Sequence, residues 1–432
     1  MMGWLPLLLV LLPAQVRAES STFTVGGYIQ TVLDASPEVQ KAAADFAAAR
    51  AAWKGQTASA WLPTVGLTGT AYPYGHDPAE GYRFQHWGLA RADTSLAASA
   101  SLNLFNGFAD YYKVRQTALS RDTAEASLSG SRQARAFAAA QAFYDLGLKA
   151  RLIEVAAENL KIQKDNHELT LDHYRNGMKS LADLLKSETD WHSSGLNVAR
   201  AEAERRQALL EFNLLAGRPA DEPAALAAEL DPGTTTLPSL AADVAAALAR
   251  RPEMASARLA LEAGETAVKQ ALRDGLPQLS ANASWSRTDN GSNIGNPAVN
   301  PNYQVGLSLS LPLGFNAATQ VFSVSAARAR SAAARQSLAA ATRQVRSEVH
   351  SAFIALESAL DTYRIASLKE DIARRSFELV NEQYRQNSAD VIRLAQAQLD
   401  YLNARTERAR ALFGALLSRY QYRLAIGEPL WK

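Results

Sequence analysis

The sequence predicts a mainly α-helical protein with a small β part, built from one unit that is used twice. Three observations predict this fold class. Two parts of the chain match each other from end to end. Each part contains a very long segment in which apolar residues recur about every 3.5 positions, as in coiled coils. Each part also contains two segments of about ten residues in which apolar and polar residues alternate, as in strands.

The composition limits the classes of function. The chain has 432 residues, of which 47% are hydrophobic, so it can bury a large core. Its 45 Lys and Arg residues are interleaved with 43 Asp and Glu residues, without the basic stripe of a nucleic-acid binder. We therefore expect no nucleic-acid partner. The absence of cysteine excludes disulfides, thiolate nucleophiles, thiolate zinc sites and a lipid-modified mature N-terminus.

The N-terminal segment is typical of a secretory signal. An apolar run over residues 4–12 is followed by Pro13 and by a small-residue cleavage pattern that ends at Ala18, although no Lys or Arg precedes the run. The run is too short to cross a bilayer as a helix, and no later segment reaches about 18 apolar residues. We predict that residues 1–18 are a signal peptide and that the mature chain is exported.

The two halves of the chain match in order and in spacing. Residues 36–71 parallel residues 251–286. Further matched pairs are Pro63 and Pro277, Phe143 and Phe353, Tyr174 and Tyr384, Asp190 and Asp400, and Gly217 and Gly427. Chance similarity of alanine-rich helices would not match prolines, glycines and aromatic residues in this order. We place a first repeat at 19–219, a linker rich in Pro, Ala and Thr at 220–238, and a second repeat at 239–432.

Each repeat opens with a predicted helix of about 25 residues. It opens just after Pro37 or Pro252, with the proline near its first turn, where a missing N–H costs little. It is expected to stop before Pro63 or Pro277.

Two predicted strands follow each opening helix. The four alternating segments are 62–72, 95–105, 278–287 and 303–313. Alternation of this kind indicates one apolar and one polar face. The segments 73–91 and 288–302 between the paired strands are rich in Gly, Pro, Asn and Asp, and we expect exposed loops there.

After the strands, each repeat contains one very long helix. From Asp110 to Tyr174 the helix would be roughly 100 Å long, and a helix of that length needs a partner along its whole length. The opening helix and a closing helix over 180–216 together are nearly as long, so we expect them to lie end to end along it. The break between the long helix and the closing helix then becomes a hairpin. Gly177 suits a left-handed turn there, and Asn387 stands at the corresponding position of the second repeat.

The strands point to a membrane. Four strands with one apolar face are too few to close a barrel, which needs about eight. A tilted strand of about ten residues crosses a bilayer, where only a closed barrel pairs all backbone groups of strands. We therefore expect several chains to share one barrel that carries a helical extension. The alternative is a soluble sheet that packs its apolar face on a helix.

The order helix, strand pair, long helix, hairpin and helix, used twice, resembles the TolC family of outer-membrane efflux proteins. The local signatures are Tyr-Arg-x-Gly at 174–177, Tyr384-Arg385, and the Gly-x-Pro ends of both repeats. The resemblance covers almost the whole mature chain. It implies a homotrimer with a twelve-stranded β-barrel in outer-membrane lipid and a periplasmic α-helical barrel. It also implies a periplasmic adaptor protein and an inner-membrane pump, of the resistance-nodulation-division or ATP-binding cassette type, as partners.

The resemblance also assigns site residues, because the hairpin ends of that family form the periplasmic entrance and contact the adaptor. The corresponding residues here are Tyr174, Arg175, Gly177, Lys179, Ser180, Tyr384, Arg385, Asn387 and Asp390. Tyr384 would help to hold the entrance shut. A basic residue that partners the closed state in some members aligns with Ala389, and its counterpart in the first repeat is Lys179.

The constriction of the entrance departs from the family pattern. The candidate residues are Asp183, Lys186, Tyr384, Arg393 and Gln396. The acidic rings of some family members align with Arg393 and Gln396 in the second repeat, so a cation-attracting ring is not expected from that repeat. Three-fold symmetry would instead repeat Arg393 around the axis. Alternatively, Arg393 is a solvated helix residue or forms a salt bridge.

No catalytic constellation is found. His167 and His173 are six residues apart and so lie on different helix faces, unlike a metal-binding pair. Phosphate loops and nucleophile elbows are absent, so we expect neither an enzyme nor a cofactor. The expected function is export of drugs, toxic compounds or metal ions through the outer membrane. The alternatives are the channel of a type I protein secretion system and, more distantly, a soluble periplasmic coiled-coil scaffold.

Overall fold

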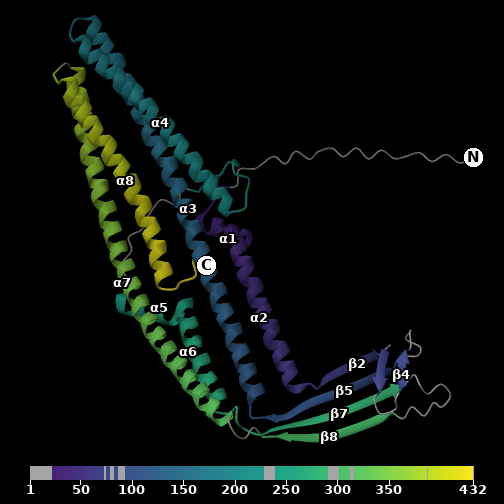
Figure 1. The fold of residues 1–432 in the computed structure, drawn as a ribbon. Helices are drawn as coiled ribbons and strands as arrows, with labels where there is room; N and C mark the ends of the chain where they lie inside the picture. The colour runs from purple at the N-terminus through teal and green to yellow at the C-terminus, as the bar shows by residue number, and fades with distance from the viewer. Residues whose placement is uncertain are drawn as a thin grey trace, which may run out of the picture.

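The helices of the molecule run together as a rod, and its four longest strands extend from one end of that rod (Figure 1). The computed structural model describes residues 22–72, 74–77, 82–85, 93–227, 239–289, 301–311, 316–386 and 388–431. The predicted signal peptide, part of the predicted linker and Asn387 lie outside the described residues.

The two halves of the described chain follow the same order of elements. The first half contains α1 (Val25–Ala35), α2 (Pro37–Trp61), β2 (Thr64–Tyr72), β5 (Asp93–Asn106), α3 (Ala109–Arg175) and α4 (Leu181–Leu215). The second contains α5 (Leu240–Arg250), α6 (Pro252–Ala271), β7 (Gln278–Asp289), β8 (Asn302–Ser310), α7 (Asn316–Arg385) and α8 (Val391–Ala425). The predicted fold class, mainly helical with a small β part, is confirmed.

Three features differ from the expectation. Segment 73–91 was expected to be a loop, but it contains an antiparallel hairpin of β3 (Tyr74–Asp77) and β4 (Tyr82–Gln85). The helix α6 stops before Pro277 as predicted, but it has 20 residues where about 25 were expected, because the chain turns over residues 272–275. The helices α1 and α5 and the short parallel pair of β1 (Thr22–Phe23) and β6 (Ala225–Leu226) were not predicted.

The junction between α1 and α2 depends on one residue. The Ser36 backbone N–H donates to the carbonyl of Val32 at 2.9 Å and ends α1. The Ser36 hydroxyl accepts from the backbone N–H of Val39 at 3.4 Å and begins α2, with Pro37 in the first turn. A serine at this position therefore caps two helices and sets the bend between them.

The four long strands form one antiparallel sheet in the order β2-β5-β7-β8. The register aligns Val65 with Ala100, Ala100 with Ala283, and Ala283 with Val305, whereas the neighbouring row consists of polar or small residues. The predicted one-sided alternation is thus confirmed. It is interrupted at Leu104, where the register against β7 shifts, and the apolar row continues with Phe105 opposite Leu279.

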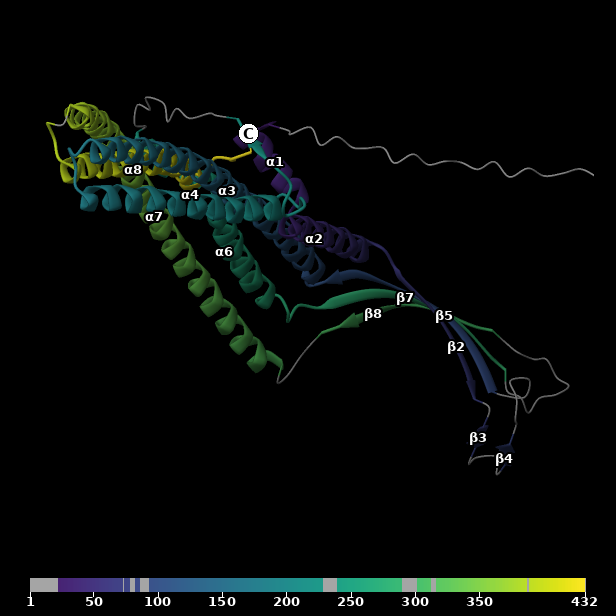
Figure 2. The same cartoon turned by 90° about the horizontal axis from the view of Figure 1, so that it is seen from above.

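The long helices lie side by side in the sequence α2, α3, α6 and α7, and α4 and α8 pair with the far parts of α3 and α7 (Figures 1 and 2). The predicted stacking of two shorter helices along one long helix is confirmed in both halves. Close approach of α3 to its neighbours is possible because its buried face includes Ala136, Ala139 and Ala140, each fully buried. Within the described residues, no helix combines the length and the apolarity that a membrane-spanning helix needs.

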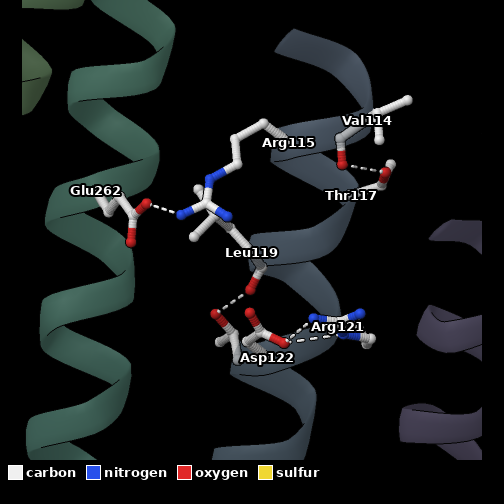
Figure 3. A network of polar contacts seen from close by, with 8 residues as sticks. Val114, Arg115, Thr117, Leu119, Arg121, Asp122 and Glu262 are labelled. Atoms are coloured by element: carbon white, nitrogen blue, oxygen red, sulfur yellow. Dashed lines mark hydrogen bonds and ion pairs between the residues drawn. The ribbon is translucent and has the colours of Figure 1, made fainter. Parts of the chain in front are cut away.

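Polar contacts connect α3 with its neighbours, and Figure 3 shows the one to α6. Arg115 of α3 forms an ion pair with Glu262 of α6, and this hydrogen bond raises the pKa of the guanidinium. Arg121 bonds to Asp122 and places its guanidinium 4.4 Å above the ring of Trp53 in α2. Because these groups are exposed or half-buried, the contacts add little to the stability of the fold.

The chain enters α3 through two consecutive residues in the left-handed region, Gly107 at φ 64° and Phe108 at φ 67°. A Cβ on Gly107 would lie 3.0 Å from the carbonyl oxygen of Arg273 and 3.0 Å from the Cβ of Leu276. We expect Gly107→Ala to lower the free energy of unfolding by about 1–2 kcal/mol from the backbone alone. The clash adds to this loss. Guanidinium unfolding followed by far-UV circular dichroism measures the effect.

Gly55→Ala is the matched control. Gly55 lies inside α2, and a Cβ there would meet nothing within 4 Å. This variant is expected to gain about 0.5–1 kcal/mol, because alanine loses less backbone entropy in a helix. Equal losses in the two variants would contradict the assignment of a strained junction at Gly107.

Candidate functional site at the hairpin ends

The first hairpin ends α3 with a left-handed glycine. Gly177 has φ 73°, the left-handed conformation predicted for it, and glycine adopts this conformation without strain because it has no Cβ. The Met178 backbone N–H donates to the carbonyl of His173 at 2.8 Å, and the Gly177 N–H donates to that of Tyr174 at 2.9 Å. These two bonds are a Schellman motif, which satisfies carbonyls that the end of the helix leaves free.

The start of α4 is fixed by a capping box. The Asp183 backbone N–H donates to the Ser180 hydroxyl at 3.2 Å, and the Ser180 N–H donates to the Asp183 carboxylate at 3.1 Å. Ser180 and Asp183, both singled out from the sequence, therefore hold the turn in shape.

The second hairpin repeats this geometry. The Ser388 backbone N–H donates to the carbonyl of Gln383 at 2.8 Å, the same five-residue bond as that from Met178 to His173. At the start of α8, the Arg393 backbone N–H donates to the Asp390 carboxylate at 2.7 Å. Both hairpins are thus built by the same local rules.

Tyr384 lies between the two hairpins and is fully buried. Its hydroxyl is 2.8 Å from the Thr170 hydroxyl, which donates its own proton to the carbonyl of Asn166 at 2.7 Å. Since Thr170 has no second proton to give, Tyr384 is the donor. Burial, with a smaller effect from the Asp183 carboxylate, raises the pKa of Tyr384, so its hydroxyl stays protonated at neutral pH.

Lys179 of the first hairpin reaches across to the second. Its Nζ lies 5.0 Å from the centre of the Tyr384 ring and donates to the carbonyl of Ala389 at 3.4 Å. A cation over an aromatic face contributes about 0.5–2 kcal/mol, depending on its exposure. The lysine of one repeat thus contacts both the tyrosine and the turn of the other.

Beneath this contact the hairpins meet through polar side chains. The amide of Asn166 donates to the side chain of Gln398 at 3.1 Å. The ring of His173, only 7% exposed, lies 6.0 Å from that of Tyr384. Further in, Phe377 and Tyr401 stack at 5.6 Å.

A model of the family described as outer membrane efflux protein matches residues 28–218 and 244–427. The chain belongs to this family. The match comprises two segments, one in each half of the chain, and it confirms the resemblance drawn from the sequence. Members of this family are channels, not enzymes.

Solved structures of outer-membrane channels share the fold of this efflux protein. It resembles the outer-membrane channel OprN with a TM-score of 0.77 and 20% identity over 94% of this chain and 91% of that one. It resembles the transmembrane channel protein CusC with a TM-score of 0.80 and 16% identity over 94% and 92%. It resembles the outer membrane protein VceC of Vibrio cholerae with a TM-score of 0.78 and 16% identity over 94% and 96%. No curated protein sequence matched significantly.

The efflux protein brings only some of the predicted site residues together. Lys179 and Tyr384 meet, with Asp183 close enough to act on the tyrosine. Tyr174 is 38% exposed, and Arg175 is exposed and lies 3.9 Å from Asp172. Arg385 and Asp390, in the second hairpin, are also exposed.

The remaining constriction candidates lie apart from that contact. Lys186 pairs with Asp190, and Gln396 donates to Asp400 at 2.9 Å. Arg393 is exposed, and no ion pair of its side chain is found within the described residues.

Several buried polar residues of α3 and α8 were not predicted from the sequence. They are Asn159, Asn166, Thr170, His173 and Gln398. The signal was a seven-residue spacing of Asn159, Asn166 and His173 in α3, which places polar residues where a helix seam usually has apolar ones.

Two substitutions of Tyr384 separate its hydroxyl from its ring. We expect Tyr384→Phe to cost about 0.5–1.5 kcal/mol, because one hydrogen bond is lost while Thr170 still bonds to Asn166. Tyr384→Ala should cost about 3–5 kcal/mol, because it leaves a cavity between the hairpins. Denaturant unfolding, with hydrogen exchange at the hairpin ends, measures both. Equal losses would show that the ring does not pack as described.

Proposed function

We propose that this efflux protein exports small molecules, such as drugs, toxic compounds or metal ions, to the cell exterior. A periplasmic adaptor and an inner-membrane pump, of the resistance-nodulation-division or ATP-binding cassette type, would deliver them. The observation that carries this proposal is the placement of a one-sided sheet at one end of a long rod and two hairpins at the other (Figure 1). A rod of this kind connects two places that lie far apart.

The sheet supports a homotrimer in the outer membrane. Its outer strands β2 and β8 each have one edge without a partner strand in the described chain. On its apolar face, Val305 is 87% and Leu307 is 72% exposed, which suits contact with lipid. Three such sheets joined edge to edge give a barrel of twelve strands, in which every backbone group is paired.

The helices support a periplasmic tunnel. The 67 residues of α3 correspond to roughly 100 Å. Apolar side chains remain exposed along α7, among them Ile365, Leu368 and Ile372. Neighbouring copies of the chain would cover this stripe and close an α-helical barrel.

The hairpin ends support an entrance. Tyr174, Arg175, Arg385 and Asp390 are exposed there and would contact the adaptor, together with the turn at Gly177. Lys179 and Tyr384 would act differently, because they hold the two hairpins of one chain together. An entrance whose hairpins are joined in this way is closed, and breaking the contact would open it.

The proposal is tested first by assembly and conductance. The mature protein is expected in outer-membrane fractions as a trimer that dissociates on heating, and it should form pores in planar bilayers. A soluble monomer without conductance would refute the proposed function.

Tyr384→Ala tests the closed entrance. Removing the side chain removes the hydrogen bond from Tyr384 to Thr170 and the ring that Lys179 contacts, so the hairpins separate more readily. The single-channel conductance should therefore rise. Tyr174→Ala is the matched control, because this tyrosine holds the corresponding place in the first hairpin and is partly exposed. Unchanged conductance in Tyr384→Ala, or an equal rise in both variants, would count against the assignment.

Arg393→Glu tests the constriction. If Arg393 of three chains lines the entrance, the substitution replaces three cations with three anions, and the reversal potential in a salt gradient should shift toward cation selectivity. Lys161→Glu, at an exposed site in α3 away from the hairpin ends, makes the same change of charge and should shift it little. Equal shifts would place Arg393 outside the constriction.

A further inference from the structure

A cavity of about 440 Å³ lies near the middle of the rod, between α3, α8 and the short strand β6, with α4 at its edge. Cavities that hold small organic ligands in proteins are roughly 300–1,000 Å³ in volume, with mainly apolar walls and a few polar groups. The walls of this cavity have that composition.

One wall of the cavity is apolar. Phe143 and Leu146 of α3 and Phe413 of α8 line it, and all three side chains are buried. Phe413 lies this close to α3 because residue 147 is glycine, where a Cβ would be 2.8 Å from the ring Cε1 of Phe413. These side chains neither donate nor accept hydrogen bonds, so this part of the cavity suits an apolar group.

The segment that follows α4 forms a second wall and is held in place by backbone bonds. Residues 224–227 line the cavity. The strand β6 within this segment pairs in parallel with β1, and the backbone N–H of Ala227 donates to the carbonyl of Phe23 at 2.8 Å. The fold itself thus shapes the cavity, and a ligand would not have to order this wall on binding.

Three charged side chains also line the cavity, and one of them lacks a partner. Arg151 forms an ion pair with Glu154 within α3. Arg205 of α4 is half-buried, and no ion pair of its side chain is found within the described residues. The cavity therefore has a cation at its edge that the described chain does not neutralise.

Arg205 also lines a more open depression next to the cavity. The cavity and the depression share Ala150 and Arg205, so the guanidinium lies where the two meet. Glu202 and Arg206 add one charge of each sign to the depression. The excess positive charge at Arg205 is thus unchanged by its surroundings on α4.

We propose that this cavity binds an organic carboxylate with an apolar body. The carboxylate would lie against the guanidinium of Arg205, which can donate two parallel hydrogen bonds to it. The body would lie against Phe143, Leu146 and Phe413 and gain from the burial of apolar area. Binding of this kind goes beyond the proposed function, because it is a property of the folded chain and does not depend on the formation of a pore.

The absence of cysteine allows a direct test with 1-naphthoate as the probe. Ala225→Cys places a single thiol in the wall of the cavity, and its rate of reaction with a maleimide is measured in the assembled full-length protein. Saturating 1-naphthoate should slow this reaction about tenfold or more, because a bound ligand excludes the reagent. The cation 1-naphthylmethylammonium has the same apolar body and should give no protection. A thiol introduced by Glu168→Cys, at an exposed site of α3 outside the cavity, should react equally fast with and without 1-naphthoate.

A matched pair of arginine variants tests the role of the charge. In the Ala225→Cys background, Arg205→Gln should raise the concentration of 1-naphthoate that gives half protection by about tenfold, because a charge-assisted hydrogen bond is lost. Arg200→Gln makes the same change at an exposed site of α4 outside the cavity and should leave that concentration unchanged. Far-UV circular dichroism checks that each variant folds, and Arg205→Met, which also removes the charge, replaces Arg205→Gln if the latter does not fold.

Three results would overturn the proposed site. They are no protection by 1-naphthoate, equal protection by the cationic probe, and equal half-protecting concentrations in the Arg205 and Arg200 variants. A thiol at position 225 that never reacts would mean that the cavity is covered in the assembled protein, and it would overturn the site as well. Protection in a protein that forms no pores would support the site and refute the proposed function.

Discussion

A long helix needs a packing partner along its whole length, and this requirement determines how the helices of the molecule are arranged. The helix α3 has 67 residues, and α2 with 25 and α4 with 35 cover nearly all of it. What remains is a joint where the end of α4 meets the start of α2, and α1 fills it. Tyr28 of α1 donates to the carbonyl of Phe212 at 2.7 Å and stacks on its ring at 3.8 Å. In the second half, α5 holds the same joint through Asp243 and Tyr422.

Packing along the rod changes with distance from this joint. Around Tyr28 and Phe212 the core is apolar and aromatic, so burial of area stabilises it without directional demands. Toward the hairpin ends the seam of α3 carries Asn166 and His173 instead. Hydrogen bonds there are specific but contribute little net stability, and some polar atoms are left unpaired. The middle of the rod is thus held mainly by apolar and aromatic contacts, whereas the hairpin ends combine a hydrophobic cluster around Tyr384 and Phe377 with polar contacts.

Much of this fold could be predicted, because long-range order in a helical rod follows from periodicity, length and proline positions. The long helix of the first half and its closing partner were predicted to within one residue at each end. The helix α1 could have been predicted too, since Val25, Tyr28, Ile29, Val32 and Leu33 follow a helical period. The contact of Lys179 with Tyr384 could not, because two residues from different repeats meet only through the packing of four helices. A sequence pattern assigns each residue to a hairpin but does not set the distance between hairpins.

Duplication explains why matched residues of the two hairpins can make different contacts. Both ends share the bond that spans five residues at the end of the long helix, from Met178 to His173 and from Ser388 to Gln383. The side chains at matched positions have diverged. Tyr174 is partly exposed, whereas its counterpart Tyr384 is fully buried, and Lys179 of the first copy reaches the backbone of its own counterpart, Ala389. One copy thus supplies the buried ring and the other supplies the cation and the imidazole around it. Because the two copies differ, this contact forms between the two hairpins of one chain, whereas a ring of identical repeats would form one and the same contact at every interface.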